Sequence, residues 1–245
     1  MKRLALAGLA LPLLLTLGAC GESSESNVPT SVVTAVPPPA GQQWIDVAAE
    51  TPEGGFRIGN PDAPLKLVEY ASHTCPHCAD FAAESHEGIE EYVSTGAVSF
   101  ELRNQVHDPL DMTMALLARC GDPATFQPLA SQFWANQPQI MQSVQNDPQA
   151  LQQAMQAPPA QQFQQIAEAT GLIDFVAARG VSREQATQCL ARTDLAQQIA
   201  ERSQTQSEEL DVQGTPTFFL NGNKLDVGSW EQLDPILRQK GAPSA

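Results

Sequence analysis

The feature that most constrains this chain is the tetrapeptide Cys75-Pro76-His77-Cys78, which stands between two segments of different hydrophobic period. The apolar run from Leu65 to Tyr70 precedes it and is typical of a buried central strand. An amphipathic segment with Phe81, Ile89 and Tyr92 follows it, as a helix would require. The sequence therefore predicts a strand, a short loop and a helix whose first turn carries both cysteines.

The first turn of a helix favours an ionised sulfur. Its N–H groups have no intrahelical partner and the helix dipole is positive there, so we expect the pKa of Cys75 to fall below about 8.5. Pro76 suits this turn because an N-terminal helical residue needs no N–H donor. We expect Cys78, one turn further in, to be the less exposed cysteine and to close a short disulfide with Cys75.

A lone Cys-x-x-Cys also serves as half of a zinc site, and Cys75 and Cys78 with His73 or His77 are the candidate ligands for one. Outside residues 73–78 the chain contains no second Cys-x-x-Cys and no His-x-x-x-His that would complete a closed tetrahedral site. We therefore expect neither a metal nor a cofactor.

Three stretches of this sequence resemble the DsbA-like branch of the thioredoxin superfamily, a group of periplasmic thiol:disulfide oxidoreductases. The first is Cys75-Pro76-His77-Cys78. The second is Gly59-Asn60-Pro61-Asp62-Ala63-Pro64, which leads into the predicted strand at Leu65, and the third is Gly214-Thr215-Pro216-Thr217-Phe218. The likeness covers roughly residues 56 to 245 and is weakest in the middle.

The resemblance implies an α/β protein with a thioredoxin fold and an inserted helical subdomain. The pattern agrees, because Val98, Phe100 and Leu102 alternate with polar residues as in a half-buried strand, and residues 107–207 show helical periodicity with frequent prolines. The expected division is a signal peptide at 1–19, a lipidated cysteine and flexible tether at 20–55, the first half of the thioredoxin fold at 56–106, the helical insertion at 107–207 and the second half at 208–245.

Shorter signals place other elements. Ser182 with Gln185 predicts a capping box at the start of the helix that carries Cys189, and Asn221-Gly222 between two β-rich runs predicts a hairpin. Ser229 with Gln232 predicts a capped final helix, which Pro235 interrupts so that it restarts at Asp234. The glutamines between 127 and 165 are expected on solvated helix faces.

Glu69 has two interpretations. It is either a carboxylate on an edge strand in water, or a buried acid beneath the dithiol, where the resembled family also has a glutamate six residues before its first active-site cysteine. A buried Glu69 would relay protons to and from Cys78. The resemblance also implies that Pro216 is cis and faces the dithiol, so that the backbone of Thr215 pairs with an extended substrate segment.

The charges near the dithiol bear on its redox direction. We expect His77 and the helix N-terminus to stabilise the Cys75 thiolate, and a stabilised reduced form makes a strong oxidant. The alternative is that His77 is a plain surface residue. No role is evident for His73, His86 or His107.

Two further cysteines remain. If Cys75 pairs with Cys78, Cys120 and Cys189 are left for each other, and in an oxidising compartment we expect a structural disulfide between two helices of the insertion. The alternative is two separate buried thiols.

The N-terminus predicts export. Lys2 and Arg3 precede an apolar run that ends at Leu17, which is typical of a secretory signal and short for a membrane span. Leu17-Gly18-Ala19-Cys20 looks like a lipobox with lipidation at Cys20, and the alternative is an ordinary signal peptidase site after Ala19. By resemblance to Gram-negative lipoproteins, Gly21 after the lipidated cysteine favours the periplasmic side of the outer membrane over the inner one.

Charge excludes one class of function. Cleavage of the signal would remove two of the 13 basic residues and none of the 28 acidic ones, which leaves a net charge of -17. Such a surface repels phosphate backbones and anionic headgroups, so we expect no nucleic-acid binding and attachment to the membrane through acyl chains alone. The short polar tether is no dimerisation domain, and we therefore expect a monomer.

Three hypotheses follow for the function. The first is an oxidase of exported cysteine-containing proteins that a membrane redox partner reoxidises. The second is a reductase or isomerase of the same fold, which Thr215 keeps open because it resembles the residue before the cis-proline in several isomerases. The third is a non-enzymatic chaperone or metal-carrying lipoprotein.

Overall fold

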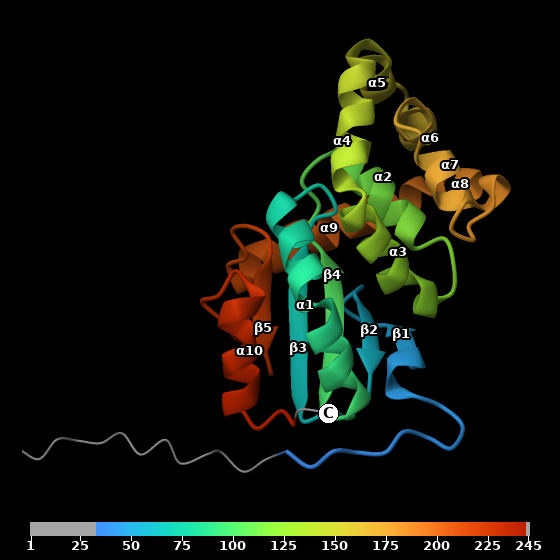
Figure 1. The fold of residues 1–245 in the computed structure, drawn as a ribbon. Helices are drawn as coiled ribbons and strands as arrows, with labels where there is room; N and C mark the ends of the chain where they lie inside the picture. Colours follow the sequence, from blue (N-terminus) through green and yellow to red (C-terminus); the bar gives the residue numbers. More distant parts are fainter. Residues whose placement is uncertain (1–32, 244–245) are drawn as a thin grey trace, which may run out of the picture.

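The structure is a computed structural model and describes residues 33–243 (Figure 1). The strands are β1 (Ala48–Glu50), β2 (Phe56–Gly59), β3 (Leu65–Ala71), β4 (Val98–Asn104), β5 (Thr217–Leu220) and β6 (Asn223–Lys224). The helices are a 3-10 turn η1 (Trp44–Asp46), α1 (Pro76–Ser94), α2 (Pro109–Ala118), α3 (Pro123–Ala135), α4 (Gln137–Asn146), α5 (Pro148–Met155), α6 (Pro159–Ala169), α7 (Leu172–Ala177), α8 (Arg183–Leu190), α9 (Thr193–Leu210) and α10 (Trp230–Gln239).

All six strands belong to one mixed sheet in the order β1-β2-β4-β3-β5-β6. β3 and β4 are parallel and α1 joins them, whereas β5 runs antiparallel to β3. Helices α1 and α10 lie in front of the sheet in Figure 1. Helices α2 to α9 stand between β4 and β5 in the sequence and gather beyond one end of the sheet. The expected α/β fold with an inserted helical subdomain is confirmed.

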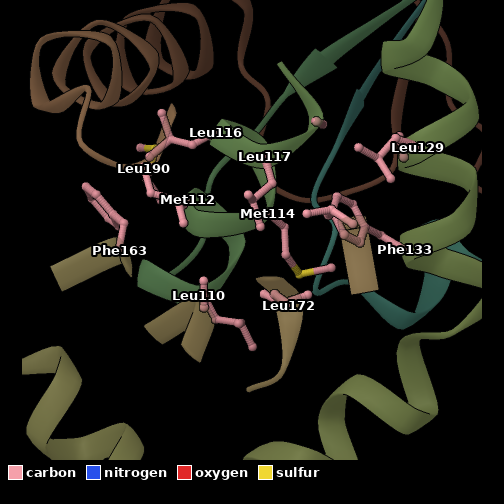
Figure 2. Packing of buried hydrophobic residues seen from close by; sticks show 14 of the residues in the cluster. Leu110, Met112, Met114, Leu116, Leu117, Leu129, Phe133, Phe163, Leu172 and Leu190 are labelled. Atoms are coloured by element: carbon pink, nitrogen blue, oxygen red, sulfur yellow. The ribbon is translucent and has the colours of Figure 1, made fainter. Parts of the chain in front are cut away.

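Two clusters of buried side chains hold the two parts, and the cluster of the insertion extends to Phe56 and Leu102 of the sheet. The sheet packs against α1 and α10 through side chains such as Leu67, Phe81 and Leu233. The insertion is built around α2, whose residues from Leu110 to Ala118 are all buried. Figure 2 shows side chains of α2 packed against Phe133, Phe163 and other residues of the surrounding helices. A helix that is buried on every side needs neighbours on every side, and the insertion supplies most of them.

Several local predictions are confirmed. Ser182 and Gln185 form the capping box of α8. Asn221 and Gly222 connect β5 to β6 with positive φ angles of 51° and 78°, as a tight hairpin requires. The second strand is shorter than the predicted β-rich run, because only Asn223 and Lys224 pair with β5.

Other predictions are wrong. The strand β4 is buried on both faces, since Ser99 and Glu101 are buried as well as the apolar residues. Glu101 has partners there, because it accepts a hydrogen bond from Thr51 and pairs with Arg103. The folded part begins before residue 56, since Trp44 is buried and β1 pairs with β2. The last helix runs through Pro235 without a break, and no side chain caps its first turn, since Gln232 instead accepts a hydrogen bond from the N–H of Gly228.

Candidate active site

The predicted dithiol lies where β3 passes into α1. Cys75 is the N-cap residue with an extended backbone, Pro76 is the first helical residue and Cys78 lies in the first turn. Both cysteines are free. Cys75 is 7% exposed and Cys78 is 0% exposed, so the prediction that Cys78 is the more buried is confirmed. The two thiols thus share a helix N-terminus but differ in their access to solvent.

The surroundings of Cys75 favour its thiolate and lower its pKa to about 5. The largest cause is a hydrogen bond from the thiol of Cys78, and burial acts in the opposite direction. Further contributions that lower the pKa come from Thr215 and from the backbone N–H groups of Cys78 and His77. The first-turn amides therefore act as the sequence predicts.

Cys78 behaves in the opposite way. Burial raises its pKa far above the ordinary value, and donation of its hydrogen to Cys75 and the charge of Glu69 add to this effect. At neutral pH the reduced site therefore holds a thiolate at Cys75 and a thiol at Cys78. Only one of the two sulfurs is a ready nucleophile.

The loop before β5 faces the dithiol. The peptide bond between Thr215 and Pro216 is cis, as the resemblance implies. The thiol of Cys75 donates a hydrogen bond to the carbonyl oxygen of Thr215 at 3.2 Å. The buried hydroxyl of Thr215 has no hydrogen-bond partner among the described residues while Cys75 is a thiol. Once Cys75 ionises, its sulfur accepts from that hydroxyl, which is why Thr215 lowers the pKa of Cys75.

Glu69 lies beneath the dithiol on β3 and is 2% exposed, so the edge-strand interpretation is wrong. Burial, and to a lesser degree the nearby charge of Cys75, raise its pKa to about 8. Its Oε1 atom is buried and has no hydrogen-bond partner within the described chain. Glu69 therefore carries a proton at neutral pH and has a free oxygen with which to exchange it.

The insertion holds the active-site loop, residues 72–75, through the backbone. The indole of Trp134 donates to the carbonyl oxygen of Ser72 at 2.9 Å. The side-chain amide of Gln137 donates to the carbonyl oxygens of His73 at 3.0 Å and Cys75 at 3.1 Å. The carboxylate of Asp111 accepts from the N–H of His73 at 2.8 Å. Three side chains from α2, α3 and α4 thus fix one short loop.

His73, to which the sequence assigns no role, is fully buried within this loop. Its Nδ1 lies 3.4 Å from Asp111 Oδ1 and 3.4 Å from Asn104 Nδ2. Its ring stacks on Trp134 with centroids 5.6 Å apart, and its Nε2 has no partner among the described residues. Neither Asp111 nor Gln137 was a predicted site residue, and the expectation that the glutamines of this region face solvent is wrong for Gln137.

His77 differs from its predicted role. Its side chain is 78% exposed and its Nδ1 lies 4.0 Å from a carboxylate oxygen of Asp80. Its contribution to the low pKa of Cys75 comes from its backbone N–H. The side chain of His77 therefore points outward beside the dithiol, where it is available to a bound substrate.

The other predicted disulfide is present. Cys120, just after α2, bonds to Cys189 of α8, and their Cα atoms are 5.7 Å apart. The bridge joins two helices of the insertion, as predicted, and excludes the alternative of two separate thiols.

Two negative findings concern the described residues, 33–243. No group of three or more His, Cys, Asp or Glu side chains there is arranged to hold a metal ion. No helix in this range has the length and apolar content that a bilayer crossing requires. The predicted signal peptide and the lipidation site Cys20 lie outside the described residues.

Comparison with known proteins gives consistent results. A family model described as Thioredoxin matches residues 51–239. A curated relative from Rickettsia conorii, named "Putative protein-disulfide oxidoreductase", is 26% identical over 184 residues, and the alignment covers 73% of this chain but only 57% of the relative.

Solved structures agree in fold. The crystal structure of a protein-disulfide isomerase from Novosphingobium aromaticivorans is 34% identical, with a TM-score of 0.72 over 76% of this chain and 97% of that one. That of alpha-DsbA1 from Wolbachia pipientis is 18% identical, with a TM-score of 0.61 over 78% of this chain and 92% of that one. The second likeness concerns the fold alone.

Proposed function

Since this chain belongs to the thioredoxin family, with the DsbA-like form of the fold, we propose that it is a thiol:disulfide oxidoreductase that oxidises cysteine pairs in exported proteins. The observation that carries the proposal is the unequal ionisation of the two sulfurs, because the pKa of Cys75 is about 5 and that of Cys78 is raised. Such a pair has one reactive sulfur and one that stays protonated until the reaction needs it.

The reaction starts from the Cys75–Cys78 disulfide. A substrate thiolate attacks the sulfur of Cys75, a mixed disulfide forms and Cys78 leaves with the electron pair of the broken bond. Glu69, protonated at neutral pH because its pKa is about 8, supplies the proton that Cys78 requires. Proton transfer is needed here, because burial strongly disfavours a charged Cys78.

The second step releases the product. A second substrate thiolate attacks the substrate sulfur of the mixed disulfide, and Cys75 leaves as a thiolate. The substrate loses two electrons and two protons to form its disulfide. The enzyme gains both electrons and one proton: Cys78 keeps the proton from Glu69, one substrate proton returns to Glu69 through solvent, and the second goes to solvent. The environment that lowers the pKa of Cys75 thus also makes Cys75 a good leaving group.

The direction of the reaction follows from the same asymmetry. A stabilised Cys75 thiolate stabilises the reduced enzyme, and a stable reduced form makes the disulfide an oxidant. The carbonyl oxygen of Thr215 is held by the Cys75 thiol and becomes free when Cys75 ionises or enters a disulfide. The cis-Pro216 loop then offers backbone groups to an extended, cysteine-containing segment of the substrate.

We also propose that the protein acts outside the cytoplasm, on the periplasmic side of a membrane. The basic start and apolar run at the N-terminus support export, and the stretch before Cys20 supports lipidation and attachment to the periplasmic side of the outer membrane. Reoxidation then requires a membrane redox partner. The net charge of -15 supports clients other than nucleic acids.

The test is the redox equilibrium of the purified protein against glutathione. We expect a reduction potential well above the roughly -270 mV of thioredoxin. The variant Cys75→Ser should lose all activity. Cys78→Ser cannot form the active-site disulfide, and its Cys75 thiolate should instead form a mixed disulfide with oxidised glutathione that no neighbouring thiol displaces. A potential at or below that of thioredoxin would falsify the oxidase.

Isomerisation is the second candidate, because the crystal structure that is 34% identical to this chain is titled a protein-disulfide isomerase. Refolding of scrambled ribonuclease separates the two functions. An oxidase restores activity to reduced ribonuclease but leaves the scrambled form largely inactive, whereas an isomerase acts on the scrambled form.

A further inference from the structure

A cleft of about 380 Å³ opens between α1 and α3 and reaches the face of the sheet. Its inner surface is mostly apolar, with Phe81 and Ile89 from α1 and Phe100 and Leu102 from β4. A volume of this size falls within the range of small-molecule sites, about 300 to 1,000 Å³. The cleft is therefore large enough for a compact organic molecule.

Glu69 lines this cleft and is the only buried acid that does so among the described residues. Its Oε1 atom has no hydrogen-bond partner in the described chain, whereas buried polar atoms are nearly always paired. An apolar cleft with one unpaired, buried carboxyl group is complementary to a molecule that has an apolar body and one strong hydrogen-bond donor.

We propose that the α1–α3 cleft binds a small organic cation, namely a primary amine on an alkyl or arylalkyl body. The body would pack between Phe81, Ile89 and Leu102, and the ammonium group would pair with Glu69. A neutral molecule of the same shape would form only an uncharged hydrogen bond with the protonated carboxyl group, and a carboxylic acid would place two acids together. The cleft should therefore discriminate by charge as well as by shape.

The other charged groups around Glu69 favour the same ligand. His86 and Glu90 of α1 line the exposed mouth of the cleft, with 3.6 Å between His86 Nε2 and a carboxylate oxygen of Glu90. Cys75 and Cys78 lie beside Glu69 in the active site. The side that α3 contributes contains no charged residue. Among the described residues neither Lys nor Arg lines the cleft, and His86 lies beside Glu90 at its mouth, so no basic side chain is paired with Glu69.

Proton release gives this binding mode a signature. The pKa of Glu69 is about 8, so at pH 6.5 the carboxyl group is mostly protonated before the amine arrives. Pairing with an ammonium ion favours the carboxylate, so about one proton should leave for each amine bound. Binding through apolar contacts alone would release none.

The redox state of the dithiol should also change the affinity for the amine, an expectation that rests on the proposed function. A thiolate at Cys75 adds a negative charge near Glu69, so the reduced protein should bind the amine more tightly than the oxidised protein. By linkage, the amine should then favour the reduced form to the same extent.

The first experiment is calorimetric titration of the purified full chain with 4-phenylbutylamine at pH 6.5, in two buffers of different ionisation enthalpy. We expect one site, release of about one proton, and binding at least about tenfold tighter than that of the neutral isostere 4-phenylbutanol. Equal affinity for the amine and the alcohol, or no proton release, would overturn the proposal.

Two variants separate the charge from the cavity. Glu69→Gln keeps the shape of the side chain and should lower the affinity for the amine to that for the alcohol. Ser131→Phe fills the cleft from α3, leaves Glu69 in the sequence, and should weaken the binding of both ligands. A full-strength amine site in either variant would contradict the assignment, provided that circular dichroism shows both proteins folded.

Isoleucine methyl spectra locate the ligand. Ile45, Ile58 and Ile89 line the cleft and should shift on addition of the amine, while Ile173 and Ile199 of the insertion should not. Shifts confined to the insertion would overturn the proposal. Because these measurements also work on the oxidised protein, an ordinary pKa for Cys75 would refute the oxidase and leave the amine site standing.

Discussion

The active-site loop is held from two sides, and the two sides contact different atoms of it. The thioredoxin half places Glu69 and Thr215 beside the sulfurs, where they set the protonation of the dithiol. The insertion places Asp111, Trp134 and Gln137 against backbone N–H and carbonyl groups of residues 72–75. One side thus controls ionisation and the other controls position.

This division has a physical reason. A thiolate responds strongly to nearby charges and donors, so the groups that tune it must lie close to the sulfur. Backbone groups outside regular structure need partners wherever they are buried, and a separate helical layer can supply them without altering the charge at the site. Variants in the two regions should therefore change different measured quantities.

The largest effect is expected from Glu69 on the thioredoxin side. Its pKa is raised from 4.5 to about 8, so between these values the folded protein keeps a proton that the unfolded chain has lost. Stability must then fall as the pH rises through this window, by on the order of 5 kcal/mol. Glu69→Gln should abolish this slope and be the more stable protein above pH 8.

Urea unfolding of the oxidised protein at a series of pH values checks this prediction. The oxidised form is required because the lowered pKa of Cys75 gives the reduced protein an opposite trend, in which stability rises from about pH 5 toward the ordinary pKa of 9. In the oxidised protein Cys75 carries no charge, so burial alone raises the pKa of Glu69 and the fall in stability should be somewhat smaller than about 5 kcal/mol. An unchanged slope in Glu69→Gln would show that another group dominates the pH dependence.

The next largest effect belongs to the insertion. The Cys120–Cys189 bridge closes a loop with a sequence separation of 69 residues. Its removal in the double variant Cys120→Ser, Cys189→Ser should cost about 4 kcal/mol of unfolding free energy on the chain-entropy account. The pH profile of Cys75 alkylation should not move, because neither residue contributes to its pKa. A shifted profile would mean that the insertion also tunes the sulfur.

Gln137 tests the backbone contacts themselves. Gln137→Met keeps the length of the side chain but leaves the carbonyl oxygens of His73 and Cys75 without their amide donor. We expect a loss of about 2 kcal/mol in urea unfolding, with the alkylation pKa of Cys75 unchanged. Gln139→Met on the exposed side of α4 is the matched control and should change neither quantity.

The same contrast explains what the sequence could predict. The dithiol stands in a short motif between a strand and a helix, so local spacing was enough to place it. The burial of Glu69 and the cis bond before Pro216 were implied by the family resemblance and not by spacing. The side chain of Gln137 bonds to the backbone of Cys75 at a sequence separation of 62 residues, and that of Trp134 bonds to the backbone of Ser72 at the same separation. A hydrogen bond from a side chain to a distant backbone group leaves no local pattern, and among many glutamines nothing in the sequence selects Gln137.

His73 shows a related limit. A histidine two residues before Cys75 is unremarkable by spacing, and its burial depends on Asp111, Asn104 and Trp134, which come from three other elements. The outward side chain of His77 could not be predicted either, because its position between the cysteines fixes its backbone and leaves the rotamer to solvent and to Asp80. Periodicity placed the helices correctly but could not show which of their polar side chains turn inward.

The smallest effect is expected at Thr215, where only one hydrogen bond to the sulfur changes. Thr215→Val keeps the shape of the side chain and removes the hydroxyl that stabilises the thiolate, so the pKa of Cys75 should rise from about 5 by roughly one unit. Stability of the oxidised protein should stay nearly constant, because that hydroxyl has no partner among the described residues before Cys75 ionises. Thr215→Ser should restore the low pKa. The rate of iodoacetamide alkylation between pH 3 and 9 gives the pKa of Cys75 in all three proteins. If the Thr215→Val variant loses stability without a shift in this pKa, Thr215 acts like the insertion residues and only positions the loop.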